Sequence, residues 1–167
     1  EKIYQLDRYG RDVEKFPLKI KEMTNFGHSL FDYNKSKRYR IMVLGNDNSI
    51  TNLNIKGKKV LGWKYSNNER INQELFHFKK SDKDYIVKSS DNKIELLAIN
   101  GTSRIEFKSD QTLFNKNNII LDNNYDLITV TNNGLFICNL NGSSNKIAIN
   151  NLDSTSLLAF SKLNNQL

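Results

Sequence analysis

Short apolar stretches of five or six residues alternate along the chain with polar turns rich in Asn, Asp, Gly and Ser. One turn recurs at Gly10, Gly57, Gly101 and Gly142, with spacings of 47, 44 and 41 residues. Apolar side chains recur seven and four residues before each glycine, and in three copies an aromatic side chain follows six residues after it. The first set is Ile3, Ile50, Ile94 and Leu135; the second is Leu6, Leu53, Leu97 and Cys138; the aromatics are Phe16, Trp63 and Phe107, with Ala148 in the fourth copy. This period, carried by short strands and glycine turns, is typical of β-propeller blades.

Each full repeat is predicted to form four antiparallel strands, because runs of this length between turn formers favour hairpins. The expected strands are 29–33, 39–44, 50–55 and 59–63 in the second repeat, 75–78, 85–87, 94–99 and 104–107 in the third, and 119–121, 127–130, 135–140 and 146–149 in the fourth. We therefore expect one all-β domain, a partial β-propeller with about three full blades (28–72, 73–117 and 118–153) and part-blades at both ends (1–27 and 154–167).

The terminal repeats are incomplete in the sequence. Residues 3–6 and 12–20 supply only the last two strands of a repeat, and 156–160 resemble the first strand of another. Closed propellers use about four to eight blades. The remaining blades come from a larger chain or from a second copy in a homodimer, or else the repeats form an open arc.

Composition agrees with thin apolar strands and long polar turns, because 38% of residues are hydrophobic and the mean hydropathy is −0.60. The net charge of +7 is expected to keep turns and strand edges soluble. The densest basic cluster, Lys35, Lys37, Arg38 and Arg40, carries no RNA-binding signature or zinc-ligand spacing, which disfavours a nucleic acid as partner. An anionic surface remains the alternative.

Catalytic chemistry has little support in the residue pattern. Cys138 is the only cysteine, so no internal disulfide forms, and its place in an apolar strand indicates a buried inert thiol. His28 and His77 are not at a spacing typical of paired metal ligands. No apolar run approaches the length of a membrane span. We expect no enzyme activity, no cofactor and no transmembrane segment.

The third and fourth strands carry a motif that resembles known propeller repeats. It runs Ile-x-x-Leu-Asn-x-x-Gly-x-x-Val-x-Gly-Trp from Ile50 to Trp63, and the first copy begins Ile3-Tyr4-Gln5-Leu6-Asp7 and ends in Phe16-Pro17. This resembles the blades of FG-GAP/VCBS and quinoprotein-like (PQQ or WD40-like) propellers, in which an aromatic docking residue is followed by Pro. It is also similar to propeller regions in large envelope proteins of Bacteroidetes-type bacteria, which implies a cell-envelope or periplasmic location.

FG-GAP blades bind calcium through alternating Asp and Asn residues between the first two strands. The matching positions here are Asp32, Asn34 and Ser36, flanked by Lys35 and Lys37. Because calcium usually requires six to eight oxygen ligands with several carboxylates, one carboxylate between two lysines falls short. We therefore predict turn formers at these positions, with a weak calcium-dependent adhesion site as the alternative.

The expected function is a non-catalytic interaction or structural module that binds a protein partner, or the remaining blades, through its loops. The candidate partner-binding residues lie in two equivalent loops and are Asp32, Asn34, Arg38, Arg40, Lys80, Asp82 and Lys83. The aromatics at the glycine-plus-six position are expected to pack between blades. The alternative is a ligand-binding or enzymatic propeller whose pocket includes Asp32, His77 and Asp122 and is completed by further blades.

Overall fold

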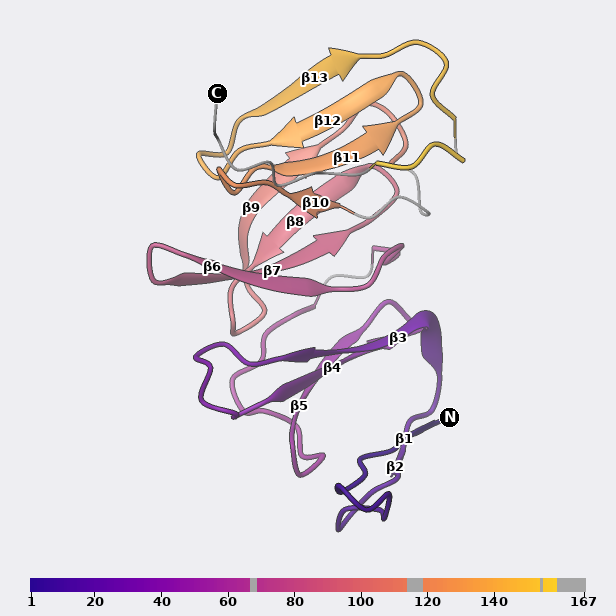
Figure 1. Cartoon of the computed structure of the whole chain (residues 1–167), viewed down its shortest axis with the longest axis vertical. Helices are drawn as coiled ribbons and strands as arrows, with labels where there is room; N and C mark the ends of the chain where they lie inside the picture. Colours follow the sequence, from indigo (N-terminus) through magenta and orange to yellow (C-terminus); the bar gives the residue numbers. More distant parts are fainter. Residues whose placement is uncertain (67–68, 114–118, 154, 159–167) are drawn as a thin grey trace.

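The computed structural model of the chain describes residues 1–66, 69–113, 119–153 and 155–158. Within these residues the chain forms thirteen β-strands and no helix. The strands make antiparallel sheets that follow one another along the long axis of the molecule in sequence order (Figure 1). The all-β class and the blade-like sheets of a partial propeller are therefore confirmed.

Four sheets make up the stack, and each is a simple up-and-down meander. The part-blade pairs β1 (Lys2–Ile3) with β2 (Leu18–Lys19). Blade 2 contains β3 (Met23–Phe31), β4 (Arg40–Gly45) and β5 (Ile50–Asn54). Blade 3 contains β6 (Phe76–Lys80), β7 (Lys83–Ser89), β8 (Lys93–Leu97) and β9 (Ser103–Lys108). Blade 4 contains β10 (Ile120–Leu121), β11 (Leu127–Thr131), β12 (Gly134–Cys138) and β13 (Ser144–Ala148).

Three hydrophobic clusters hold the sheets together, and each lies between two neighbouring sheets. We call these contacts the first joint (part-blade to blade 2), the second joint (blade 2 to blade 3) and the third joint (blade 3 to blade 4). Strand β4 shows how one strand serves two joints: Ile41 and Val43 belong to the first, and Met42 and Leu44 to the second. Because side chains alternate across a strand, a continuous apolar run buries both faces of a blade.

The repeated glycines form the same hydrogen-bonded turn four times. In each copy the glycine N–H donates to the carbonyl three residues earlier, at 2.8–3.0 Å. The φ angles are +77° at Gly10, +70° at Gly57, +84° at Gly101 and +92° at Gly142. Glycine reaches this left-handed region without the steric cost that other residues meet, so the turn explains why the repeat is marked by glycine.

Close packing across the second joint occurs where Trp63 meets Gly101. A Cβ atom at Gly101 would lie 3.1 Å from two ring carbons of Trp63 and 2.8 Å from the Tyr65 nitrogen. The indole N–H of Trp63 donates to the Ile50 carbonyl at 2.6 Å. Phe16 and Phe107 are buried in the first and third joints.

Several details differ from the sequence expectation. Strand β3 begins at Met23, inside the predicted part-blade 1–27, and β6 and β7 extend into the predicted loop 79–84. The predicted strand 59–63 is reduced to a single bridge between Leu53 and Lys59. Beyond it the Trp63 indole, instead of a backbone group, bonds the Ile50 carbonyl. The predicted strand at 156–160 lies partly outside the described residues, and its described part, 156–158, is not a strand.

Candidate functional site

An open groove of about 730 Å³ lies between blades 2 and 3, where the β3–β4 loop and the β6–β7 turn project from the same side of the stack (Figure 1). Three predicted partner-binding residues, Asp32, Asn34 and Asp82, line this groove together with His77 of the alternative pocket. They come from equivalent loops of two neighbouring blades, so the stacking of the repeats brings them together. We call this space the loop groove.

The β3–β4 loop is shaped by Asp32. One carboxylate oxygen accepts the N–H of Ser36 at 3.0 Å and the other accepts the N–H of Lys37 at 2.9 Å. Lys35 and Lys37 take the left-handed conformation, with φ of +51° and +60°. This is the local capping that Asp provides in tight turns, and it occupies both oxygens of the predicted calcium carboxylate. The described residues contain no group of three or more His, Cys, Asp or Glu side chains close enough to hold a metal.

His77 and Asp84 form a half-buried pair beside the groove. His77 Nε2 lies 2.8 Å from Asp84 Oδ1, and each side chain is 13% exposed. The His77 ring meets the Tyr33 ring edge to face, with centroids 4.8 Å apart, and Phe31 packs at 5.7 Å. An imidazole held by a carboxylate in this way has a defined orientation and offers its other ring nitrogen for a hydrogen bond.

Tyr33 contributes a buried hydroxyl to the same floor. Within the described part of the chain, its Oη has no hydrogen-bond partner. Burial raises the pKa of Tyr33, and the Arg40 charge offsets this only in part. The hydroxyl therefore stays protonated at neutral pH and keeps its capacity to donate a hydrogen bond.

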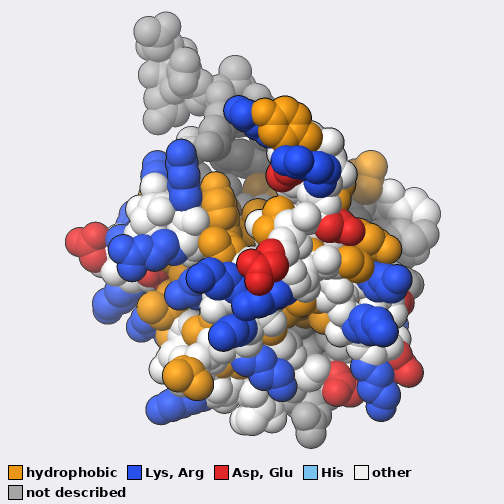
Figure 2. Space-filling view, turned by 90° about the horizontal axis from the view of Figure 1, so that it is seen from below, with side chains coloured by type: hydrophobic (Ala, Val, Ile, Leu, Met, Phe, Trp, Pro, Cys, Tyr) orange, Lys and Arg blue, Asp and Glu red, His pale blue; other side chains and the backbone are white. Residues whose placement is uncertain are grey.

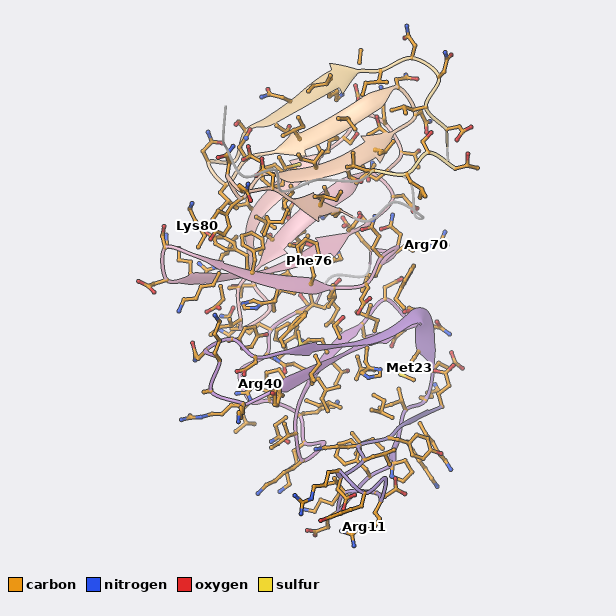
Figure 3. The ribbon with its side chains drawn as sticks, in the orientation of Figure 1. Arg11, Met23, Arg40, Arg70, Phe76 and Lys80 are labelled. Atoms are coloured by element: carbon orange, nitrogen blue, oxygen red, sulfur yellow. The ribbon has the colours of Figure 1, made fainter. Side chains whose placement is uncertain are left out.

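The other predicted partner-binding residues surround the groove without lining it. Lys80 lies over the Tyr125 ring, with Nζ 4.0 Å from the ring centroid, so it also contacts blade 4. Arg40 is half-buried, whereas Arg38 and Lys83 are exposed. Figure 3 labels Lys80 and Arg40 on the same side of the stack. The alternative catalytic residue Asp122 does not line the groove that His77 lines, and its Oδ1 accepts the N–H groups of Asn124 and Asp126 in its own turn.

A buried ionic cluster at the opposite end of blade 3 has no counterpart in the sequence predictions. Lys88 is 1% exposed and its Nζ lies 3.1 Å from Glu95 and 3.4 Å from Glu69. Lys93 Nζ lies 2.6 Å from Glu69. Arg70, next to Glu69 in the chain, is labelled on the side of the molecule opposite Lys80 (Figure 3). The second joint thus has an apolar centre with a polar cluster at each end.

Electrostatics hold Lys93 in its charged form. Burial lowers the pKa of Lys93, but its hydrogen bond to Glu69 and the charges of Glu95, Glu69 and Glu106 outweigh burial and raise it. The signal in the sequence is a pair of opposite charges, Lys88 and Glu95, that stand next to apolar residues in two strands and lie directly opposite each other. A buried ion pair of this kind favours one alignment of the two strands more than it adds to the stability of the fold.

Comparison with known proteins identifies no family, because neither a protein-family model nor a curated protein sequence matches the chain. The resemblance to FG-GAP/VCBS and quinoprotein-like repeats stays a prediction. In the described part of the chain no helix has the length and hydropathy required to cross a bilayer.

Proposed function

We propose that this chain is a non-catalytic interaction module that binds a polypeptide partner in the loop groove. The observation that carries the proposal is the composition of that groove. Its edge presents both signs of charge, with Lys79 3.6 Å from the fully exposed Asp82. Its floor offers the rings of Tyr33 and His77. A polar edge around aromatic side chains is the anatomy of a protein–protein interface.

The arrangement of the blades supports this use. Stacked repeats place equivalent loops on one side, and loops on a rigid scaffold commonly carry binding residues. Lysines and aspartates share the groove, so its charge suits a polypeptide of mixed charge better than a polyanion.

A peptide-display experiment tests the proposal. Random peptides are selected on the full chain, and the affinity of each selected peptide is measured by fluorescence anisotropy. The variant Lys35→Glu/Lys79→Glu reverses two charges that line the groove. The matched control, Lys56→Glu/Lys58→Glu, makes the same net charge change on exposed residues of the β5 turn outside the groove. We expect loss of binding in the first variant alone. Equal binding by both variants would contradict the proposal.

A second candidate, a ligand-binding or catalytic groove, is favoured by the His77–Asp84 pair with the Tyr33 hydroxyl beside it. This site would take a small polar ligand that accepts hydrogen bonds. A thermal-shift screen with small polar fragments tests it, using His77→Phe as the variant that keeps an aromatic ring. Fragments that stabilise the wild type but not His77→Phe support this candidate, and the absence of any such fragment removes it.

A further inference from the structure

The first joint contains a hollow of about 280 Å³ with a largely apolar lining. Ile3 and Phe16 line it from the part-blade, and Leu30 and Ile41 from blade 2. Leu30 is 59% exposed although it lies on a sheet face. Figure 2, which views the stack from below, shows hydrophobic side chains exposed among Lys and Arg.

Blade 3 shows what covers the position equivalent to Leu30. Leu30 pairs with Ile41, which pairs with Leu53. The same row in blade 3 is His77, Ile86 and Leu97, since Leu53 and Leu97 each stand four residues before a repeat glycine. The His77 side chain is only 13% exposed, and its ring contacts Phe31 and Tyr33 from the first strand and following loop of the preceding blade.

Among the described residues, the part-blade also presents an unpaired strand edge next to this hollow. Residues 2–6 pair with the segment 12–19 on one side only, through Lys2–Lys19, Ile3–Leu18 and Leu6–Asp12. In blade 3 the equivalent strand β8 pairs on both sides, with β7 and with β9. Gln5, which lines the hollow, has a buried side-chain carbonyl that meets no hydrogen-bond partner within the described residues. An unpaired edge beside an apolar hollow is a template for strand addition.

The outer face of the part-blade is also uncovered, as the exposure of the repeat positions shows. Four residues before the glycine, Leu53, Leu97 and Cys138 are at most 5% exposed because each faces the preceding blade. Leu6, at the same position in the first copy, is 56% exposed. The part-blade therefore displays the surface that the other blades cover.

We infer that the first joint is an acceptor site for a β-hairpin from outside residues 1–167, with apolar residues at alternating positions and an aromatic residue on its first strand. The second strand of this hairpin adds to the edge of residues 2–6, and its first strand places the aromatic ring over Leu30. The β7–β8 pairs Ile86–Leu97 and Ser89–Ile94 give the register, because Leu6 and Ile3 are the equivalents of Leu97 and Ile94. This surface is separate from the loop groove, so the two proposals stand independently.

The probe is a fluorescein-labelled synthetic peptide with the sequence of residues 76–89, the β6–β7 hairpin that covers blade 4 in the third joint. Fluorescence anisotropy measures its binding to the full chain. Leu30→Glu places a charge in the hollow, and Leu61→Glu makes the same change at a leucine that is 97% exposed elsewhere. Because both residues are exposed, we expect both variants to melt like the wild type. Binding should be saturable and weaken at least about tenfold in Leu30→Glu only.

A second readout locates the peptide on the chain. Hydrogen exchange of the amides in residues 2–6 should slow when the peptide is present, because strand addition protects alternate N–H groups. Absence of saturable binding, equal weakening in both variants, or equal binding of a scrambled peptide would overturn the inference. A chain that is dimeric by light scattering and becomes monomeric in Leu30→Glu would also overturn it, because a second copy would then be the occupant.

Discussion

Substitution of Gly101 by alanine tests the close contact between Gly101 and the segment Trp63–Tyr65 in the second joint. The added Cβ would lie 2.8 Å from the backbone nitrogen of Tyr65, which cannot move aside as the end of a flexible side chain can. It would also lie 3.1 Å from the Trp63 ring. Gly142→Ala is the matched control, because this glycine makes the same turn with a φ of +92° and meets no described atom within 4 Å.

The expected losses follow from two separate costs. A left-handed φ costs alanine roughly 1 kcal/mol at either position. Overpacking adds typically about 2 kcal/mol where a neighbouring atom cannot yield. We therefore expect the free energy of unfolding to fall by about 1 kcal/mol in Gly142→Ala and by about 3 kcal/mol in Gly101→Ala. The loss in Gly57→Ala should lie between these two values, because the new Cβ would meet the flexible end of the Leu18 side chain.

Urea denaturation gives the measurement. Trp63 is the only tryptophan and lies in the second joint, so its fluorescence reports the unfolding of that joint. Far-UV circular dichroism followed in parallel reports the whole stack. Equal losses in Gly101→Ala and Gly142→Ala would refute the idea that the repeat glycine accommodates a side chain of the preceding blade.

The remaining predictions concern buried and capped groups. Lys88→Met should lower the free energy of unfolding by about 3 kcal/mol, because the Glu95 carboxylate loses its buried ion pair with Lys88, and Lys88→Met/Glu95→Leu should recover most of the loss in urea denaturation. Burial raises the pKa of the Cys138 thiol from 9.0 to about 12, with a smaller contribution from Asp126, so a thiol reagent should modify it only after unfolding. The stability linked to Cys138 is complete below pH 9.0 and should be lost as pH rises toward 12; rapid modification of the native thiol would contradict this. Calcium should give no heat on calorimetric titration and no rise in melting temperature, because the described residues place no group of three or more acidic, His or Cys side chains together around Asp32 or elsewhere.

Much of the fold could be predicted from the sequence because the repeat is carried by strong local signals. Glycine at a left-handed turn and apolar residues at fixed offsets define each blade without knowledge of its neighbours. The fourth strand of blade 2, predicted at 59–63, is only a single bridge in the structure because a tertiary contact decides how this segment is placed. The Trp63 indole bonds a carbonyl of another strand, and no local pattern encodes that.

The His77–Asp84 pair shows why part of the candidate site was not predicted. The segment from Lys79 to Asp84 reads as a loop of six residues because it lacks an Asn-Gly turn. In the structure Lys80 pairs with Lys83, and Ser81 and Asp82 both take positive φ, +46° and +59°. This tighter turn lengthens both strands and brings Asp84 beside His77. Pairing of side chains on neighbouring strands depends on register, which the sequence expectation left open.

The strands that serve two joints have a consequence for how register is specified. In β4, apolar side chains face both neighbours, so a slip of one residue would still leave apolar groups on each face. The hydrophobic pattern alone therefore distinguishes poorly between alternative strand registers. The turns fix the register instead, because their hydrogen bonds and positive φ angles fit one alignment of the strands. This explains why the fourth copy of the repeat can have Cys138 in place of leucine and Ala148 in place of the aromatic residue, whereas the glycine is present in all four copies.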